Sequence, residues 1–169
     1  MDFEIRHVEA ADVPQVFNLW RDLVAEELAT YQDGKAYPSL DLDEPGVAAD
    51  WFARYGESLV NPDIRFWVAV VDGHPVGFLV AYEFERMTGF PKRIIHVGEM
   101  YVAPAFRTKF LIAKALEAHV ELWAKELKIE VIECSCVATE KQMNRWMRKG
   151  FTPYQTTMYR FAKWRGKDG

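Results

Sequence analysis

The side chains that could do chemistry cluster within residues 94–112. Arg107 stands at the expected start of a helix, where a positive charge is slightly unfavourable. Two interpretations stay open: Arg107 binds a phosphate, or it is an ordinary solvated side chain. Glu99 lies inside an expected strand, where a carboxylate is usually solvated or paired unless it has a function. His96, on the same strand, could act as a base or a ligand, although a lone histidine in a strand is more often structural.

The histidines and cysteines do not form a metal-binding pattern. Neither His96 nor His74 joins a set of cysteines, histidines or carboxylates at the spacing of metal ligands, so we predict no metal. Cys134 and Cys136 are the only cysteines, and at i and i+2 on an expected strand they share a face without favourable disulfide geometry. We therefore interpret both as small buried hydrophobic residues.

Composition places these residues in an ordinary globular protein. The 169 residues are 50% hydrophobic and 27% charged, which predicts one domain over residues 1–162 followed by a basic tail at 163–169. The formal net charge of −4 argues against a nucleic-acid or anionic-membrane partner and favours a small-molecule ligand. The apolar stretches are strand-sized and no secretory signal pattern is present, so we expect a cytoplasmic protein.

The periodicity of the apolar residues predicts an α/β (α+β) fold. Asp72 to Pro75 form a hairpin-like turn between two strands, and Gly98 predicts a bulge inside the next strand. The predicted elements are, in chain order, a strand at 3–8, a helix from Asp12 to Leu28, a helix from Asp43 to Tyr55, strands at 66–71, 76–84 and 94–102, a helix at 107–127, a strand at 129–137, a helix at 139–149 and a strand at 154–161.

Two short motifs resemble those of a known superfamily. Met100 to Arg107 is similar to the fourth strand of the GNAT acetyltransferases and to the start of their Arg-Gly-x-Gly-x-Gly/Ala signature. Trp146 to Phe151 is similar to their closing Tyr-x-x-x-Gly-Phe. The element order resembles the same superfamily over nearly the whole chain. The resemblance implies a three-layer fold, with a central mixed sheet whose strands 4 and 5 splay apart and with helices on both faces.

The resemblance also implies an activity and a set of site residues. A GNAT enzyme is an acetyl-CoA-dependent N-acetyltransferase, in which a primary amine of a small molecule or protein attacks the acetyl group directly. Glu99 would act as the base, directly or through water, with Glu83 and Glu85 as alternatives. No metal is implied, and homodimerisation stays open. The implied acetyl-CoA-binding residues are Met100, Tyr101, Val102, Arg107, Thr108, Lys109, Phe110, Leu111, Ile112 and Thr139.

This sequence departs from the superfamily at several of these positions. Thr108 and Phe110 stand where the signature has glycine, and Ile112 where it has glycine or alanine. Trp146 replaces the tyrosine that often protonates the leaving thiolate, and Thr139 replaces an asparagine. A second hypothesis therefore stands beside the enzyme: a GNAT-like domain without catalysis that serves as a binding or structural module.

Overall fold

The computed structural model describes residues 2–30, 44–85, 93–107, 110–134 and 140–153. The chain divides into two compact units, Met1–Ser135 and Cys136–Gly169. The strand predicted at 154–161 and the tail at 163–169 lie outside the described residues.

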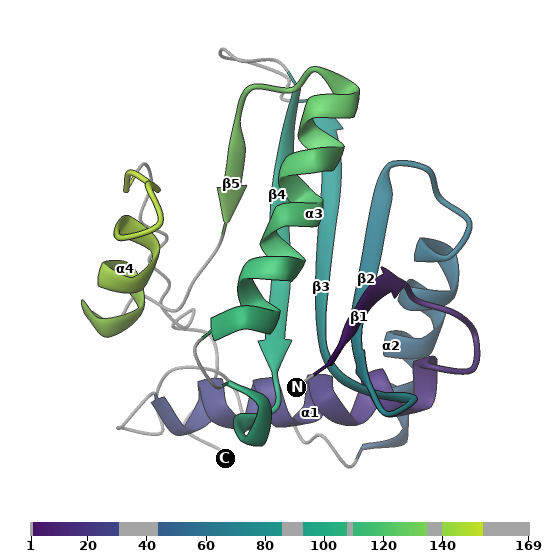
Figure 1. Cartoon of the computed structure of the whole chain (residues 1–169). Coiled ribbons are helices and arrows are strands. Elements are labelled where there is room, and N and C mark those ends of the chain that lie inside the picture. Colours follow the sequence, from purple (N-terminus) through teal and green to yellow (C-terminus); the bar gives the residue numbers. More distant parts are fainter. Residues whose placement is uncertain (1, 31–43, 86–92, 108–109, 135–139, 154–169) are drawn as a thin grey trace, which may run out of the picture. The chain divides into compact units, whose positions relative to one another are not determined.

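A mixed sheet of five strands, in sequence order, forms the centre of the first unit (Figure 1). Neighbouring strands are antiparallel except for the last two, which run parallel. The predicted α/β fold with a mixed sheet is thereby confirmed. The strands are β1 (Glu4–His7), β2 (Ile64–Val71), β3 (His74–Glu85), β4 (Arg93–Val102) and β5 (Ile132–Cys134).

The hairpin between β2 and β3 forms where the sequence predicts it. Its central residues, Asp72 and Gly73, have φ angles of 49° and 78°. Positive φ at both positions is the pattern of a type I′ turn, whose twist matches that of the strands it joins. The prediction of an antiparallel pair at this turn is confirmed.

Helices cover both faces of the sheet. Helix α3 (Leu111–Leu127) packs on one face, and α1 (Val13–Thr30) and α2 (Pro45–Ser58) pack on the other (Figure 1). Strand β2 shows the division, because Trp67 and Ala69 join the core under α3 whereas Phe66 and Val68 join the core under α1 and α2. A strand buried on both faces needs apolar residues at consecutive positions, which explains the nearly continuous hydrophobic run of β2.

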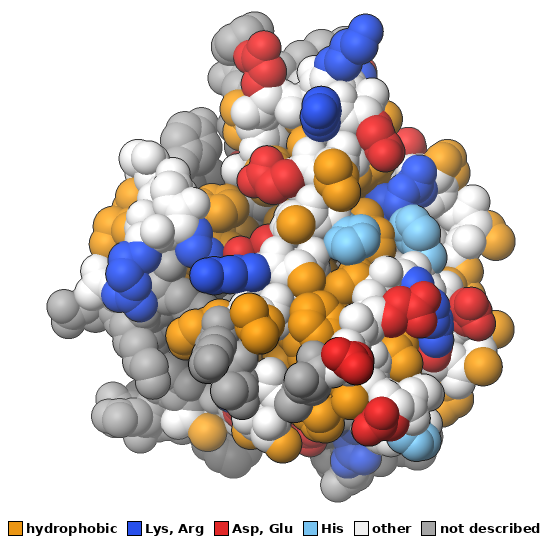
Figure 2. All heavy atoms as spheres, viewed as in Figure 1, with side chains coloured by type: hydrophobic (Ala, Val, Ile, Leu, Met, Phe, Trp, Pro, Cys, Tyr) orange, Lys and Arg blue, Asp and Glu red, His pale blue; other side chains and the backbone are white. Residues whose placement is uncertain are grey.

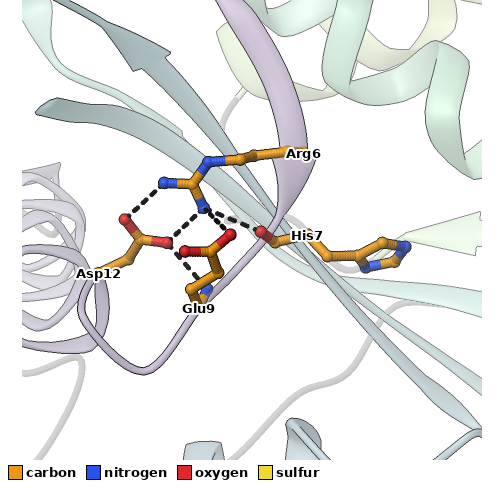
Figure 3. A network of polar contacts seen from close by, with 4 residues as sticks. All are labelled: Arg6, His7, Glu9 and Asp12. Atoms are coloured by element: carbon orange, nitrogen blue, oxygen red, sulfur yellow. Dashed lines mark hydrogen bonds and ion pairs between the residues drawn. The ribbon is translucent and has the colours of Figure 1, made fainter. Parts of the chain in front are cut away.

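The start of α1 is fixed by an ion pair with the first strand (Figure 3). Arg6 Nη1 and Nη2 donate to the two carboxylate oxygens of Asp12, at 2.6 and 2.9 Å, and the Glu9 N–H donates to Asp12 Oδ2 at 2.8 Å. Burial opposes ionisation of Asp12, but these hydrogen bonds outweigh it and lower the pKa of the carboxyl. Helix α1 begins directly after Asp12, as predicted, although the carboxylate binds the preceding strand and loop.

Helix α3 begins later than the predicted residue, Arg107. A 3₁₀ turn spans Pro104–Phe106, Arg107 ends it, and α3 begins at Leu111. Phe110, directly before the helix, has a left-handed backbone with φ of 57°. Such a residue cannot continue a right-handed helix, so the predicted start is wrong by one turn.

The second unit contains α4 (Glu140–Met147) and the segment that ends it. Gly150 takes a φ of 89°, and the Phe151 N–H donates to the Trp146 carbonyl at 3.2 Å. The Phe151 ring meets the Trp146 ring edge to face at 5.1 Å. A glycine in the left-handed region with this backward hydrogen bond is a frequent helix end, which confirms the predicted stop at Gly150.

Two surface properties bear on function. On the face covered by α3, acidic and basic side chains are interspersed with hydrophobic ones (Figure 2). Among the helices of the described ranges, none has the length and apolar character needed to cross a membrane.

Candidate active site

The site is organised by a bulge in β4. Val80 of β3 lies opposite Glu99, whereas the next residue, Ala81, lies opposite Val97, so Gly98 is an extra residue on β4. The prediction of a bulge at Gly98 is confirmed. A Cβ atom on Gly98 would lie 2.5 Å from Cε2 of Tyr82, so the glycine permits this ring to lie against the bulge.

The bulge decides which face of the sheet Glu99 occupies. Before it, Ile95 and Val97 join the core under α3; after it, Met100 and Val102 pack against that same core. Side chains normally alternate between faces along a strand. The extra residue therefore shifts the alternation, and Glu99 points instead toward α1 and α2.

There Glu99 lies among aromatic side chains, a packed cluster of Trp20, Trp51, Tyr55 and Tyr82 that we call the Glu99 pocket. The Tyr55 hydroxyl donates a hydrogen bond to Glu99 Oε2, and the Trp20 indole acts to lower the pKa of the carboxyl. Tyr55 is only 4% exposed, and its ring stacks on Trp51 with centroids 4.0 Å apart. The carboxylate thus lies among side chains from α1 and α2.

The electrostatics of the Glu99 pocket shift the pKa of Glu99 and of groups around it. Burial raises the pKa of Glu99, whereas the hydrogen bond from Tyr55, the Trp20 indole and the charge of Arg54 act against that rise. Desolvation, and then the charge of Glu99, raises the pKa of Glu27 at the end of α1. Burial and the Glu99 charge raise the pKa of Tyr82 to about 12. A perturbed carboxyl among specific partners is typical of functional sites.

The other candidate bases are placed differently. Glu83 is engaged by Arg93, whose Nε donates to Glu83 Oε1 at 2.8 Å, and Glu85 is exposed at the end of β3. His96 Nδ1 lies 3.2 Å from Glu133 Oε1 on β5. His74 is the first residue of β3, next to the hairpin turn. Only Glu99, among these candidates, lies in the aromatic pocket.

Beside Glu99, the edge of β4 that faces β5 carries no strand partner among the described residues. The parallel pair extends only from Ile95 to Val97 on β4. Within the described residues, the β4 segment Gly98–Val102 has no strand partner on that side, so its backbone can accept an extended ligand as an added strand. Met100, Tyr101 and Val102 lie on this segment.

Arg107 is bound by neighbouring groups of the protein. Its Nε donates to the Val102 carbonyl at 2.7 Å and its Nη2 to Glu26 Oε1 of α1 at 2.7 Å. The guanidinium lies 5.0 Å from the Tyr101 ring centroid, and the Tyr101 hydroxyl donates to the same Glu26 oxygen at 2.9 Å. Burial opposes ionisation of Glu26, but the hydrogen bonds from Arg107 and Tyr101 prevail and lower its pKa.

The described residues 103–107 and 110–112, which we call the entry turn, lie between the end of β4 and the end of the first turn of α3. Phe110 keeps the left-handed backbone that glycine favours, and its side chain is 58% exposed. Leu111 is also exposed, whereas Ile112 is buried in the core under α3. The Ile112 side chain therefore points away from the helix N-terminus, where N–H groups could hold a phosphate. Thr108, Lys109 and Thr139 lie outside the described residues.

No group of three or more His, Cys, Asp or Glu side chains suited to a metal ion occurs within the ranges that the structure describes. Cys134 lies partly buried on β5, opposite Val97, and Cys136 lies outside those ranges.

Sequence reasoning missed most of the residues around Glu99 and Arg107. Tyr55 and Trp20 carry the apolar spacing of helix residues that face a core, so both were indistinguishable from packing residues. Glu26 and Glu27 are ordinary polar residues near the end of a helix, so the sequence did not indicate that either lies near the site. A polar hydroxyl or indole within an apolar stripe is the one sign that could have marked Tyr55 and Trp20 as partners for a buried charge.

The parallel β4–β5 pair, the Glu99 carboxyl on β4 beyond that pair and the N-terminus of α3 after β4 form one candidate site on a mixed α/β sheet. A family model described as the acetyltransferase (GNAT) family matches residues 20–151. The chain belongs to this family. A search of the curated proteins returned no match.

Solved structures support the same fold. A transcriptional regulator from Bacillus halodurans C-125 is 14% identical, with a TM-score of 0.72 over 95% of this chain and 100% of that chain. A predicted acetyltransferase from Clostridium acetobutylicum, solved with acetyl-CoA, is 16% identical, with a TM-score of 0.71 over 95% and 96%. An aminoglycoside 6′-N-acetyltransferase from Acinetobacter haemolyticus is 18% identical, with a TM-score of 0.69 over 95% and 98%. The predicted family and fold are confirmed.

Proposed function

We propose that this chain is an acetyl-CoA-dependent N-acetyltransferase that transfers an acetyl group to a primary amine of a small molecule or protein. The observation that carries the proposal is the partly buried Glu99 carboxyl, which accepts a hydrogen bond from Tyr55 and lies beside the part of β4 that has no strand partner on the β5 side within the described residues. Residues 1–162 act as one catalytic domain in this proposal, in the cytoplasm and without a nucleic-acid or membrane partner.

Glu99 removes a proton from the acceptor amine, directly or through water. The amine nitrogen then forms a bond to the acetyl carbonyl carbon, and the carbon–sulfur bond breaks with its electron pair on sulfur. The raised pKa of Glu99 supports this role, because a base works best when its pKa lies near the working pH. Trp146 stands at the position of the family's tyrosine, and indole is not an acid at neutral pH, so the thiolate leaves without its help.

The cofactor would lie along β4 and end at α3. Backbone groups near Met100 and Val102 would pair with its pantetheine arm, and Tyr101 lies between them. The N–H groups at Leu111 and Ile112 would hold its pyrophosphate, aided by the helix dipole. The left-handed backbone at Phe110 and the inward direction of Ile112 support this fit. Arg107, Thr108, Lys109, Phe110 and Thr139 complete the proposed set.

A binding or structural module without catalysis is the second candidate. The observations that favour it are the Arg107–Glu26 ion pair, which occupies the cation otherwise available to phosphate, and the exposed Phe110 ring at the helix N-terminus. Both features weaken cofactor binding without affecting the fold.

Calorimetric titration with acetyl-CoA separates the two candidates, together with thiol release measured on a panel of neamine, spermidine and an alanine-initiated peptide. The enzyme binds acetyl-CoA and acetylates at least one of these amines. Glu99→Gln lowers kcat by about a hundredfold or more, as loss of a general base does, and leaves acetyl-CoA affinity unchanged. Glu121→Gln, an exposed change on α3, is the matched control. Absence of binding at millimolar acetyl-CoA contradicts the enzyme.

A further inference from the structure

Tyr55 makes a contact that a core residue does not need. It lies on α2 among packing residues, with its ring stacked on Trp51 and 4.8 Å from the Phe66 ring centroid. These contacts alone would be met equally well by phenylalanine. Its hydroxyl, however, reaches across to β4 and donates to Glu99 Oε2.

The ring and backbone of Tyr55 are held by the protein around them. Ser58 Oγ donates to the Tyr55 carbonyl at 2.7 Å, and Tyr55 and Ser58 are both buried. Burial, the charge of Glu99 and the hydrogen bond to it all raise the pKa of Tyr55, so the phenol stays protonated and remains a donor. A fixed donor of this kind selects one orientation of the carboxylate and stabilises its charged form.

We propose that Tyr55 is the positioning residue of the proposed acetyltransferase: its hydroxyl, by its hydrogen bond to Glu99 Oε2, orients the Glu99 carboxylate toward the acceptor amine. The inference rests on the proposed function. Tyr55 acts through Glu99 and does not itself touch the reacting atoms.

The other groups that face Glu99 do not replace this role. Arg54 of α2 favours the charged carboxylate from a distance, and the Trp20 indole of α1 acts in the same direction. Glu27 of α1 carries a charge of the same sign as Glu99, and the charge of Glu99 contributes to the raised pKa of the Tyr82 phenol on β3. Of the phenols in the Glu99 pocket, Tyr55 supplies the hydrogen bond to Glu99 Oε2.

The test compares Tyr55→Phe with Tyr82→Phe, which removes the second phenol of the same pocket. Two measurements are needed: the pH profile of kcat/KM with acetyl-CoA and the best amine of the panel, and an NMR titration of the Glu99 carboxyl in the protein without cofactor. Tyr55→Phe keeps the ring packing and removes only the donor. Since that donor lowers the pKa of Glu99, its loss moves the acid limb of the profile and the NMR titration to higher pH.

Tyr55→Phe is expected to lower kcat about tenfold, with the KM for acetyl-CoA unchanged, and Tyr82→Phe to leave the acid limb in place. In the Glu99→Gln background, Tyr55→Phe causes no further loss, because the group it positions is already gone. An unchanged profile and titration in Tyr55→Phe, or an additive loss in the double variant, overturns the proposal. If the wild-type protein neither binds acetyl-CoA nor turns over, the proposed function is rejected, and the positioning role with it. If the wild type is active and Tyr55→Phe has the same kcat and pH profile, only the positioning role is rejected.

Discussion

In the Glu99 pocket, side chains from two helices surround one carboxylate. In the entry turn, Arg107 is instead paired with Glu26, a carboxylate of the protein. Tyr55 donates a partly buried hydrogen bond to Glu99, and the ring of Tyr55 stacks on Trp51. Arg107, by contrast, forms an exposed ion pair with Glu26, and Phe110 takes a backbone conformation suited to glycine. The proposed base is therefore held by dense packing, while the proposed phosphate site depends on contacts that are individually weak and easily exchanged.

Trp51→Ala should produce the largest effect, because it removes the packing behind Tyr55. Trp51 is fully buried and contacts the rings of Phe17, Trp20 and Tyr55. Deletion of a buried large aromatic side chain costs about 3–5 kcal/mol. Chemical denaturation should show a loss of this size, with Phe52→Ala, on the same helix but 39% exposed, as a milder control. A loss no greater than that of Phe52→Ala would mean that the pocket is less rigid than its contacts indicate.

Phe110→Gly should have an intermediate effect of opposite sign. The left-handed backbone at Phe110 costs an ordinary residue about 1 kcal/mol or more, and glycine takes it without this strain. The free energy of unfolding should therefore rise by about 1 kcal/mol. Phe110→Ala removes the same ring but keeps Cβ, so it isolates the backbone effect and should show no gain. Equal stability of the two variants would show that the entry turn is not strained.

Glu26→Gln should have the smallest effect, on cofactor affinity. If Arg107 must leave Glu26 to reach a phosphate, removing the carboxylate charge frees the guanidinium. An exposed ion pair is worth up to about 1 kcal/mol, which corresponds to about a threefold to fivefold tighter binding of CoA. Calorimetry with CoA and with pantetheine, which lacks the phosphates, should show the gain for CoA alone.

Asp22→Asn, on the same helix, is the control for Glu26→Gln and should leave both affinities unchanged. Weaker CoA binding in Glu26→Gln would indicate instead that the ion pair shapes the entry turn for the ligand.

Local signals in the sequence were sufficient for most of the fold. The Asp72–Gly73 turn and the Gly98 bulge were predicted because their residue types favour backbone conformations that few others adopt. The same reasoning failed at the start of α3. The apolar stripe of Ile112, Leu116 and Val120 does not mark the first residue of the helix, and the left-handed conformation at Phe110, adopted by a residue that disfavours it, leaves no trace in the pattern.

The site was predictable only in part. A sequence motif gave its position in the chain, whereas the hydrogen bonds and charges around its side chains depend on tertiary contacts. Glu99 could be singled out from the strand that carries it. Its bond to Tyr55 joins residues separated by 44 positions, and Glu26 and Arg107 are separated by 81. No spacing rule along one helix or strand connects such pairs, and each side chain taken alone is ordinary for its element.

The bulge at Gly98 also determines which genetic changes the site can survive. Deleting that single residue would restore regular alternation along β4, which would turn Glu99 into the core under α3 and send the hydrophobic side chain of Met100 toward the Glu99 pocket. A point substitution at Glu99 removes one functional group. A one-codon deletion beside it would instead move every side chain from Glu99 to Val102 to the opposite face of the sheet. The spacing between Val97 and Glu99 is therefore as much a part of the site as the glutamate itself.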